Sequence, residues 1–207
     1  LKEEGYSLIS VDYSGDDSKL ELYFQLLMTT QNICGVVAFP DVDDSALKKV
    51  LSITQAPIII VGKTISGIDA DLVLSDNFGG AYKATTHLIR SGHENIAIIC
   101  GRKDSESNID RINGYKKALG DNKIPINTQF IITDLLNDTM IFDALNNLLL
   151  DKNPPTAIFA ANYQTILSMF KFISKNNIKC PEDLSIIGFN DFEWAPLHNP
   201  PITTVAQ

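Results

Sequence analysis

The chain has few of the residues that build metal centres and disulfide frameworks. Its 207 residues include three cysteines, which are far apart in the sequence, and three histidines without metal-ligand spacing. Zinc sites need clustered ligands, and small disulfide-bonded domains carry even, closely spaced sets of cysteines. We therefore predict no metal site, and we interpret Cys34, Cys100 and Cys180 as reduced core thiols of a cytoplasmic protein.

Long hydrophobic runs and an excess of basic residues are also missing. No apolar run approaches the roughly 20 residues that cross a bilayer, and Leu1–Gly5 shows neither an initiator methionine nor a signal-peptide pattern. There are 17 basic residues against 25 acidic ones, which gives a net charge of −8. Because nucleic-acid surfaces are basic, these residues are not expected to bind DNA by themselves or to contact a membrane.

The common enzyme motifs are absent as well. The sequence contains no Gly-x-Ser-x-Gly elbow, no Gly-x-x-x-x-Gly-Lys loop and no Gly-x-Gly-x-x-Gly turn, so we expect no catalytic residue and no cofactor. Phe78-Gly79-Gly80 opens a predicted helix and could bind an anion through free backbone N–H groups. The favoured interpretation is close packing of the backbone at a helix start.

What the sequence does contain is a regular alternation of short apolar runs and amphipathic segments. Runs of four or five apolar residues are typical of strands that are covered on both faces. The predicted strands are Ser7–Val11, Val36–Phe39, Ile58–Val61, Leu72–Leu74, Ile96–Cys100, Phe130–Ile132, Ala157–Ala160 and Ser185–Phe189, with another beginning at Thr203. Alternating β and α segments indicate an α/β fold with parallel sheets.

The segments between these runs carry helical periodicity. Apolar residues recur at i, i+3, i+4 and i+7, which places them on one buried face of a helix. The four stripes are Leu20, Tyr23, Phe24 and Leu27; Ile112, Tyr115, Ala118 and Leu119; Ile141, Phe142, Leu145, Leu148 and Leu149; and Ile166, Leu167, Phe170 and Ile173. We interpret them as core, and we expect Gly5, Gly92 and Gly120 to end helices.

Short polar residues follow most of the predicted strands. In doubly wound sheets, ligands bind beyond the carboxyl ends of the strands, and these side chains suit hydrogen bonding to hydroxyl groups. The pairs are Pro40-Asp41, Gly62-Lys63, Asp76-Asn77, Gly101-Arg102, Thr133-Asp134, Asn162-Tyr163 and Asn190-Asp191. Arg111 is the most informative residue, because a cation near a helix start opposes the helix dipole. A surface pair with Asp110 or Glu106 would explain it weakly, whereas a ligand role would explain it better.

Four motifs, in order and correctly spaced, resemble the LacI/GalR transcription regulators over nearly the whole chain. The first is Asp76-Asn77-Phe78-Gly79-Gly80 with His87-Leu88-Ile89, Gly92-His93, Ile96, Ile98 and Gly101. The second is Arg111-Ile112-Asn113-Gly114-Tyr115 with Ala118-Leu119, and the third runs from Pro155 to Asn162. The fourth is residues 181–189 followed by residues 200–205.

The resemblance implies two Rossmann-like, periplasmic-binding-protein-like subdomains with crossover strands at a hinge and an effector in the cleft between them. Residues 1–75 would be an N-terminal subdomain that lacks its first strand, with Leu1–Gly5 as the tail of a helix. Residues 76–207 would be the C-terminal subdomain. The family implies a homodimer and a helix-turn-helix segment, absent from these residues, that binds operator DNA.

The resemblance also implies effector-binding residues. Arg111 and Asn162 match effector-contacting positions, Leu136 falls near a position often held by a stacking aromatic residue, and Lys63 and Ser107 fall in cleft-lining loops. Asn190 stands where the family usually has aspartate, and Tyr163 also departs from the family pattern. The loss of a carboxylate beside Arg111 leaves an acidic or phosphorylated effector open as an alternative to a neutral sugar.

The resulting prediction is a ligand-responsive transcriptional regulator, most simply a repressor, whose effector-binding and dimerisation core is this chain. The alternative is a secreted sugar-binding protein of a transporter, which shares the fold. An enzyme on a related α/β scaffold is a third possibility, disfavoured because the sequence shows no nucleophile–base pair or metal ligand set.

Overall fold

The computed structural model describes residues 5–12, 16–30, 33–40 and 45–206. It divides the chain into two compact units, Leu1–Leu74 and Ser75–Gln207, each built around its own sheet. Within the described residues every paired strand runs parallel to its neighbour. The predicted α/β fold with parallel sheets is therefore confirmed. Among the same residues, no helix is long and apolar enough to traverse a bilayer.

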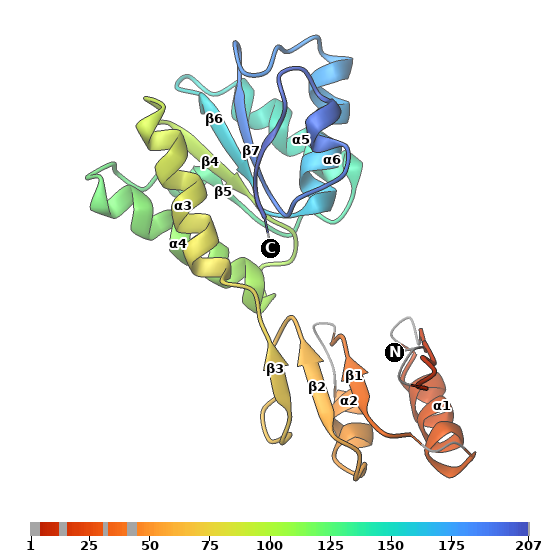
Figure 1. Ribbon diagram of the computed structural model, residues 1–207. Helices are drawn as coiled ribbons and strands as arrows, with labels where there is room; N and C mark the ends of the chain where they lie inside the picture. The colour runs from red at the N-terminus through yellow and green to blue at the C-terminus, as the bar shows by residue number, and fades with distance from the viewer. Residues whose placement is uncertain (1–4, 13–15, 31–32, 41–44, 207) are drawn as a thin grey trace. The chain divides into compact units, whose positions relative to one another are not determined.

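The first unit contains a three-stranded sheet in the order β1-β2-β3 (Figure 1). Its elements are α1 (Asp17–Thr30), β1 (Val36–Ala38), α2 (Ser45–Leu51), β2 (Ile58–Val61) and β3 (Asp71–Val73). The core forms where the apolar stripes of both helices meet alternate residues of β1 and β2, and it includes Leu20, Phe24, Leu47, Val50, Leu51, Ala38 and Ile60. The opposite face of the sheet leaves Val37 and Ile59 exposed.

The strand predicted at Ser7–Val11 is not formed. These residues have no regular secondary structure, and Leu8 is 78% exposed. A β-strand needs a neighbouring strand to pair its backbone groups, and the described sheet ends at β1. The strand-like composition of Ser7–Val11 alone is therefore not enough to form a strand. The expected helix tail at Leu1–Gly5 lies outside the described residues except for Gly5, which is in a turn.

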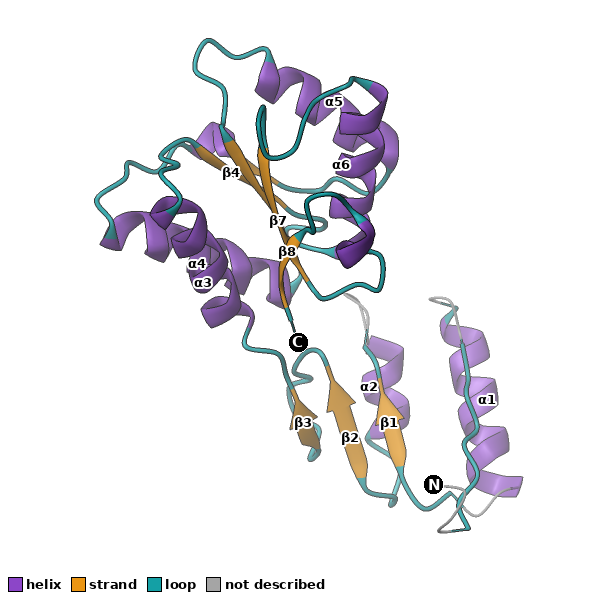
Figure 2. Ribbon diagram, turned by 45° about the horizontal axis from the view of Figure 1, so that its top comes forward, coloured by secondary structure: helices purple, strands orange, loops and turns teal. Residues whose placement is uncertain are grey.

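The second unit is a three-layer α/β sandwich around a five-stranded sheet in the order β5-β4-β6-β7-β8. Figure 2 shows α3 and α4 on one face of this sheet and α5 and α6 on the other. The elements are α3 (Asn77–Arg90), β4 (Ile96–Ile99), α4 (Glu106–Asp121), η1 (Thr128–Phe130), β5 (Ile131–Ile132), α5 (Asp138–Leu149), β6 (Ala157–Ala160), α6 (Tyr163–Lys175), β7 (Ser185–Phe189), η2 (Ala195–Leu197) and β8 (Thr203–Val205).

Two hydrophobic cores fill the spaces between these layers. The α3/α4 side buries Tyr115, Phe159 and Phe189, and the α5/α6 side buries Ile141, Leu145 and Met169 among others. The strands β4 and β6 are buried on both faces, as their continuous apolar sequences predicted. The stripes of α4, α5 and α6 supply residues to these cores, which confirms their interpretation as core.

Two smaller predictions are corrected. Helix α4 continues through Gly120 to Asp121, and the left-handed residue that follows it is Lys123, with φ 59°. In contrast, Gly92, with φ 94°, does follow the end of α3 as expected. Of the three free thiols, Cys100 is buried but Cys34 is exposed, because it precedes the edge strand β1 instead of lying within it.

The helices α3 and α4 cross at very short distance, at Gly114. A Cβ atom on Gly114 would lie 2.3 Å from the carbonyl oxygen of Phe78 and 3.1 Å from the Cβ of Ala81. Only glycine allows such a close approach of two helix backbones. The crossing brings Arg111, one turn earlier in α4, beside Asn77 at the start of α3.

Candidate functional site

The carboxyl edge of the five-stranded sheet contains a topological switch point. From β4 the chain reaches β5 on one side and then returns to β6 on the other, so the loops after β4 and β6 diverge there. Such points form ligand-binding crevices in open α/β sheets. A Cβ atom on Gly101, just after β4, would lie 3.3 Å from Asn162 Nδ2 and 3.7 Å from Asn108 Nδ2. The absence of a side chain at Gly101 lets these two amide groups approach its backbone closely.

Arg111 connects the ends of three elements at this edge. Its Nε donates to Asn77 Oδ1 at 2.9 Å, and its Nη1 donates to the carbonyl oxygen of Ala161 at the end of β6. The guanidinium carbon lies 3.8 Å from the centroid of the Phe189 ring at the end of β7. Arg111 is only 6% exposed, and this burial lowers its pKa to about 10. The side chain therefore remains charged at neutral pH.

Asn162 and Asn190 occupy the residues that follow β6 and β7. Asn162 caps α6, because its Oδ1 accepts from the backbone N–H of Thr165 at 2.9 Å, and its Nδ2 faces Gly101. Asn190 has φ 81°, and its backbone N–H donates to Val205 at 2.9 Å. The Asn190 Oδ1 atom is buried and has no hydrogen-bond partner among the described residues. Strained backbone and unsatisfied polar atoms are concentrated at functional sites.

The remaining predicted site residues are less closely joined to Arg111, Asn162 and Asn190. Ser107 is half-buried in the first turn of α4, and its Oγ lies 2.9 Å from Ser105 Oγ. Leu136 is 62% exposed in the loop after β5. Lys63 is half-buried just after β2 and belongs to the first unit.

Three supporting residues were not predicted from the sequence as part of the site. Asn77 accepts from Arg111, whereas the weaker alternative explanation of Arg111 named Asp110 or Glu106 as its partner. Asn108 is buried and donates to the carbonyl oxygen of Arg102 at 2.8 Å. Asp134, with φ 63°, donates its N–H to Gly101 at 2.7 Å and accepts from the Lys103 N–H at 3.0 Å. Asn77 and Asp134 stood among the polar residues after predicted strands, but the sequence did not indicate their partners.

The Phe78-Gly79-Gly80 segment has no free anion site of its own. The N–H of Gly79 donates to Asp76 Oδ1 at 2.7 Å, so the carboxylate of the same chain caps α3. A Cβ atom on Gly80 would lie 2.8 Å from the Phe189 ring. The interpretation as close packing at a helix start is thus confirmed. Among the described residues, no group of three His, Cys, Asp or Glu residues could hold a metal ion.

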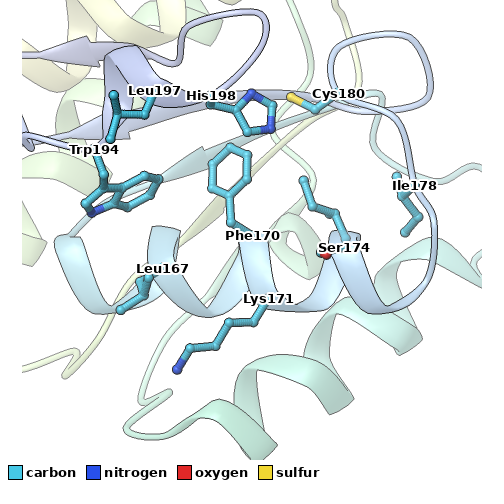
Figure 3. A pocket seen from close by; sticks show the side chains of 10 residues that line it. Leu167, Phe170, Lys171, Ser174, Ile178, Cys180, Trp194, Leu197 and His198 are labelled. Atoms are coloured by element: carbon cyan, nitrogen blue, oxygen red, sulfur yellow. The ribbon is translucent and has the colours of Figure 1, made fainter.

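A separate apolar groove lies beside α6, and Arg111, Asn162 and Asn190 are not among the residues that line it. Its volume is about 640 Å³, and the second half of α6 forms much of its lining. Figure 3 shows Phe170 pointing from α6 toward His198, while Lys171, which also lines the groove, points away from His198. Trp194 stacks on Phe192 at 4.9 Å and contacts Phe170 edge-on at 5.7 Å. Leu197, on its rim, is 83% exposed.

Residues 85–207 match the family model of the periplasmic binding protein-like domain. The chain belongs to this family. It is 28% identical over 204 residues to the HTH-type transcriptional repressor PurR of Haemophilus influenzae, in an alignment that covers 99% of this chain and 60% of PurR. The chain therefore spans about 60% of the length of that relative.

Solved structures of LacI-type regulators are also similar. A regulatory protein of the LacI family from Chloroflexus aggregans has a TM-score of 0.84 at 25% identity, covering 98% of this chain and 73% of that chain. The transcriptional regulator CelR in complex with cellobiose has a TM-score of 0.82 at 26% identity, covering 100% of this chain and 63% of that chain. The resemblance to LacI/GalR effector-binding domains is confirmed by these matches.

Proposed function

We propose that this chain is the effector-binding core of a ligand-responsive transcriptional regulator, and that its effector is a small sugar or sugar derivative. The observation that carries the proposal is the buried Arg111, held between the ends of β6 and β7 at the carboxyl edge of the five-stranded sheet. The likeness to a repressor and to a regulator bound to cellobiose supports a regulator over a transporter component.

In this proposal the effector contacts Arg111, Asn162 and Asn190. The amide of Asn162 and the guanidinium donate to sugar oxygens, while the Asn190 side chain can accept from a hydroxyl group. Ser107, Leu136 and Lys63 are proposed as further contacts of the effector. The chain itself performs no catalysis and requires no cofactor in this role.

The complete regulator, in the cytoplasm, would bind operator DNA through a helix-turn-helix segment, as the names of the HTH-type relatives suggest. Binding of the effector would change the operator affinity only if the effector binds two conformations of the protein differently.

We further propose that the protein is a homodimer. The groove beside α6 presents Phe170, Trp194 and Leu197, and its one charged lining residue, Lys171, already pairs with Asp138 at 2.8 Å. A surface with a protruding leucine next to an apolar groove is self-complementary, because across a two-fold axis the leucine of each subunit can enter the groove of the other. Sedimentation velocity should show a dimer that Leu197→Asp weakens; a monomeric wild-type protein at all concentrations would refute this part of the proposal.

A thermal-shift screen of neutral, acidic and phosphorylated sugars tests the effector-binding role. At least one compound should raise the melting temperature, because ligand binding stabilises only the folded state. Gly101→Val should abolish this shift, since its Cβ atom alone would lie 3.3 Å from Asn162 Nδ2 and the added methyl groups would displace that amide. The matched control is Gly120→Ala, which enters open space far along α4. If no sugar of any class stabilises the wild-type protein, the proposed function is wrong.

A further inference from the structure

The charge of Arg111 has no anionic partner within the described part of the chain. Its contacts are the Asn77 amide, the Ala161 carbonyl and the Phe189 ring, all of which are neutral. Burial is the main influence on its pKa, with a smaller opposing one from the Cys100 thiol, and no carboxylate contributes. A buried cation without an anion costs free energy, because neutral contacts replace its hydration only in part.

The guanidinium also keeps donor capacity. Arginine has five N–H groups, and the described hydrogen bonds of Arg111 use one on Nε and one on Nη1. Among the described residues, no hydrogen bond involves Nη2. Two parallel N–H groups are the geometry with which arginine binds carboxylates and phosphates.

The acidic side chains around this edge are engaged with other groups. Asp104 pairs with Arg102 at 3.3 Å, and Asp134 pairs with Lys103 at 3.6 Å. Asp138 pairs with Lys171, Asp76 caps α3, and Asp191 accepts from Thr204 at 3.4 Å. The residue beside the Phe189 ring is Asn190, whose amide carries no charge. The protein therefore does not supply the missing negative charge from these positions.

We propose that the effector supplies the missing negative charge. The ligand of this site is an anionic sugar derivative whose carboxylate or phosphate pairs with Arg111. This inference rests on the proposed function and narrows its ligand class. A sugar acid and a sugar phosphate share the chemistry that the site requires, namely an oxyanion for the guanidinium and hydroxyl groups for the amides of Asn162 and Asn190. A neutral sugar would leave the cation uncompensated.

Calorimetric titration of the 207-residue protein with matched ligands tests this inference. The ligands are glucose, glucuronate and glucose 6-phosphate; ribose and ribose 5-phosphate; and inorganic phosphate alone. We expect at least one anionic derivative to bind about 10- to 100-fold more tightly than its neutral parent, the range of a hydrogen bond to a charged group. Comparison of glucuronate with the sugar phosphates shows whether the site prefers a carboxylate or a phosphate.

Variants assign the preference to Arg111. Arg111→Gln should remove the preference for the anion while retaining hydroxyl contacts, and Arg111→Lys should retain part of it because the charge remains. Arg90→Gln, which removes an exposed arginine in the last turn of α3, should change neither affinity. If circular dichroism shows that Arg111→Gln does not fold, the affinities of neutral and anionic ligands for the wild-type protein decide the question. Added salt should then weaken the binding of the anionic ligands alone.

The possible failures are distinguishable. Equal affinity for a neutral sugar and its anionic derivatives would overturn this inference but leave the proposed function intact. If inorganic phosphate binds as tightly as the sugar phosphates, the assignment of the ligand as a sugar derivative is overturned. Binding of no sugar, neutral or anionic, would contradict the proposed function itself.

Discussion

Replacement of Gly114 by alanine tests the helix crossing that positions Arg111. In an ordinary helix this change would stabilise the fold by about 0.8–1 kcal/mol. Here the new methyl group would lie 2.3 Å from the Phe78 carbonyl oxygen and 3.0 Å from the Tyr82 nitrogen, both of them backbone atoms that cannot rotate away. Overpacking of this kind costs about 1–3 kcal/mol. The two contacts with backbone atoms place this site at the upper end of that range, so after the helix gain is subtracted we expect a net destabilisation of about 1–2 kcal/mol.

The matched control is Gly120→Ala in the same helix. A Cβ atom there meets nothing within 4 Å, so the substitution should stabilise the protein by up to about 1 kcal/mol. Urea denaturation followed by circular dichroism, with calorimetric melting, measures both changes; about 2–4 °C per kcal/mol is expected for a protein of this size. If both variants are stabilised, the close crossing of α3 and α4 at Gly114 is refuted.

Two further predictions concern buried groups of the second unit. Tyr115 donates its hydroxyl to the carbonyl oxygen of Ile96 at 2.7 Å, so Tyr115→Phe should destabilise by about 1 kcal/mol in urea denaturation; an unchanged stability would contradict this hydrogen bond. Burial raises the pKa of the Cys100 thiol to about 12, so a thiol reagent at pH 8 should modify exposed Cys34 quickly and Cys100 only after unfolding. Rapid modification of Cys100 in the folded protein would contradict the burial of this thiol between the sheet and helices α3 and α4.

Much of the fold follows from local patterns in the sequence. Ile58–Val61, Ala157–Ala160 and Ser185–Phe189 form strands at the predicted residues, because continuous apolar runs of this length favour buried parallel strands. Ser7–Val11 has the same kind of composition but no partner strand among the described residues. Phe130 lies in the turn η1 instead of β5. Pairing and turn geometry depend on neighbours that a local pattern does not specify.

The candidate site was predictable in its residue types and not in its contacts. Arg111 attracted notice because a cation near a helix start is locally unfavourable. Its partners, Asn77 and Ala161, are 34 and 50 residues away in the sequence, and the α3/α4 crossing and the sheet order bring them together. The absence of a side chain at Gly101 matters for a similar reason, since its neighbours Asn162 and Asn108 come from two other segments.

The most direct test of the central claim is a crystal structure of this protein with the tightest-binding sugar derivative from the screen. The account predicts that the ligand lies beside Gly101 at the carboxyl edge of the five-stranded sheet, with its oxyanion on Arg111 and hydroxyl groups within hydrogen-bond distance of Asn162. A ligand bound only in the groove of Phe170, Trp194 and Leu197, with no contact to Arg111, would contradict it.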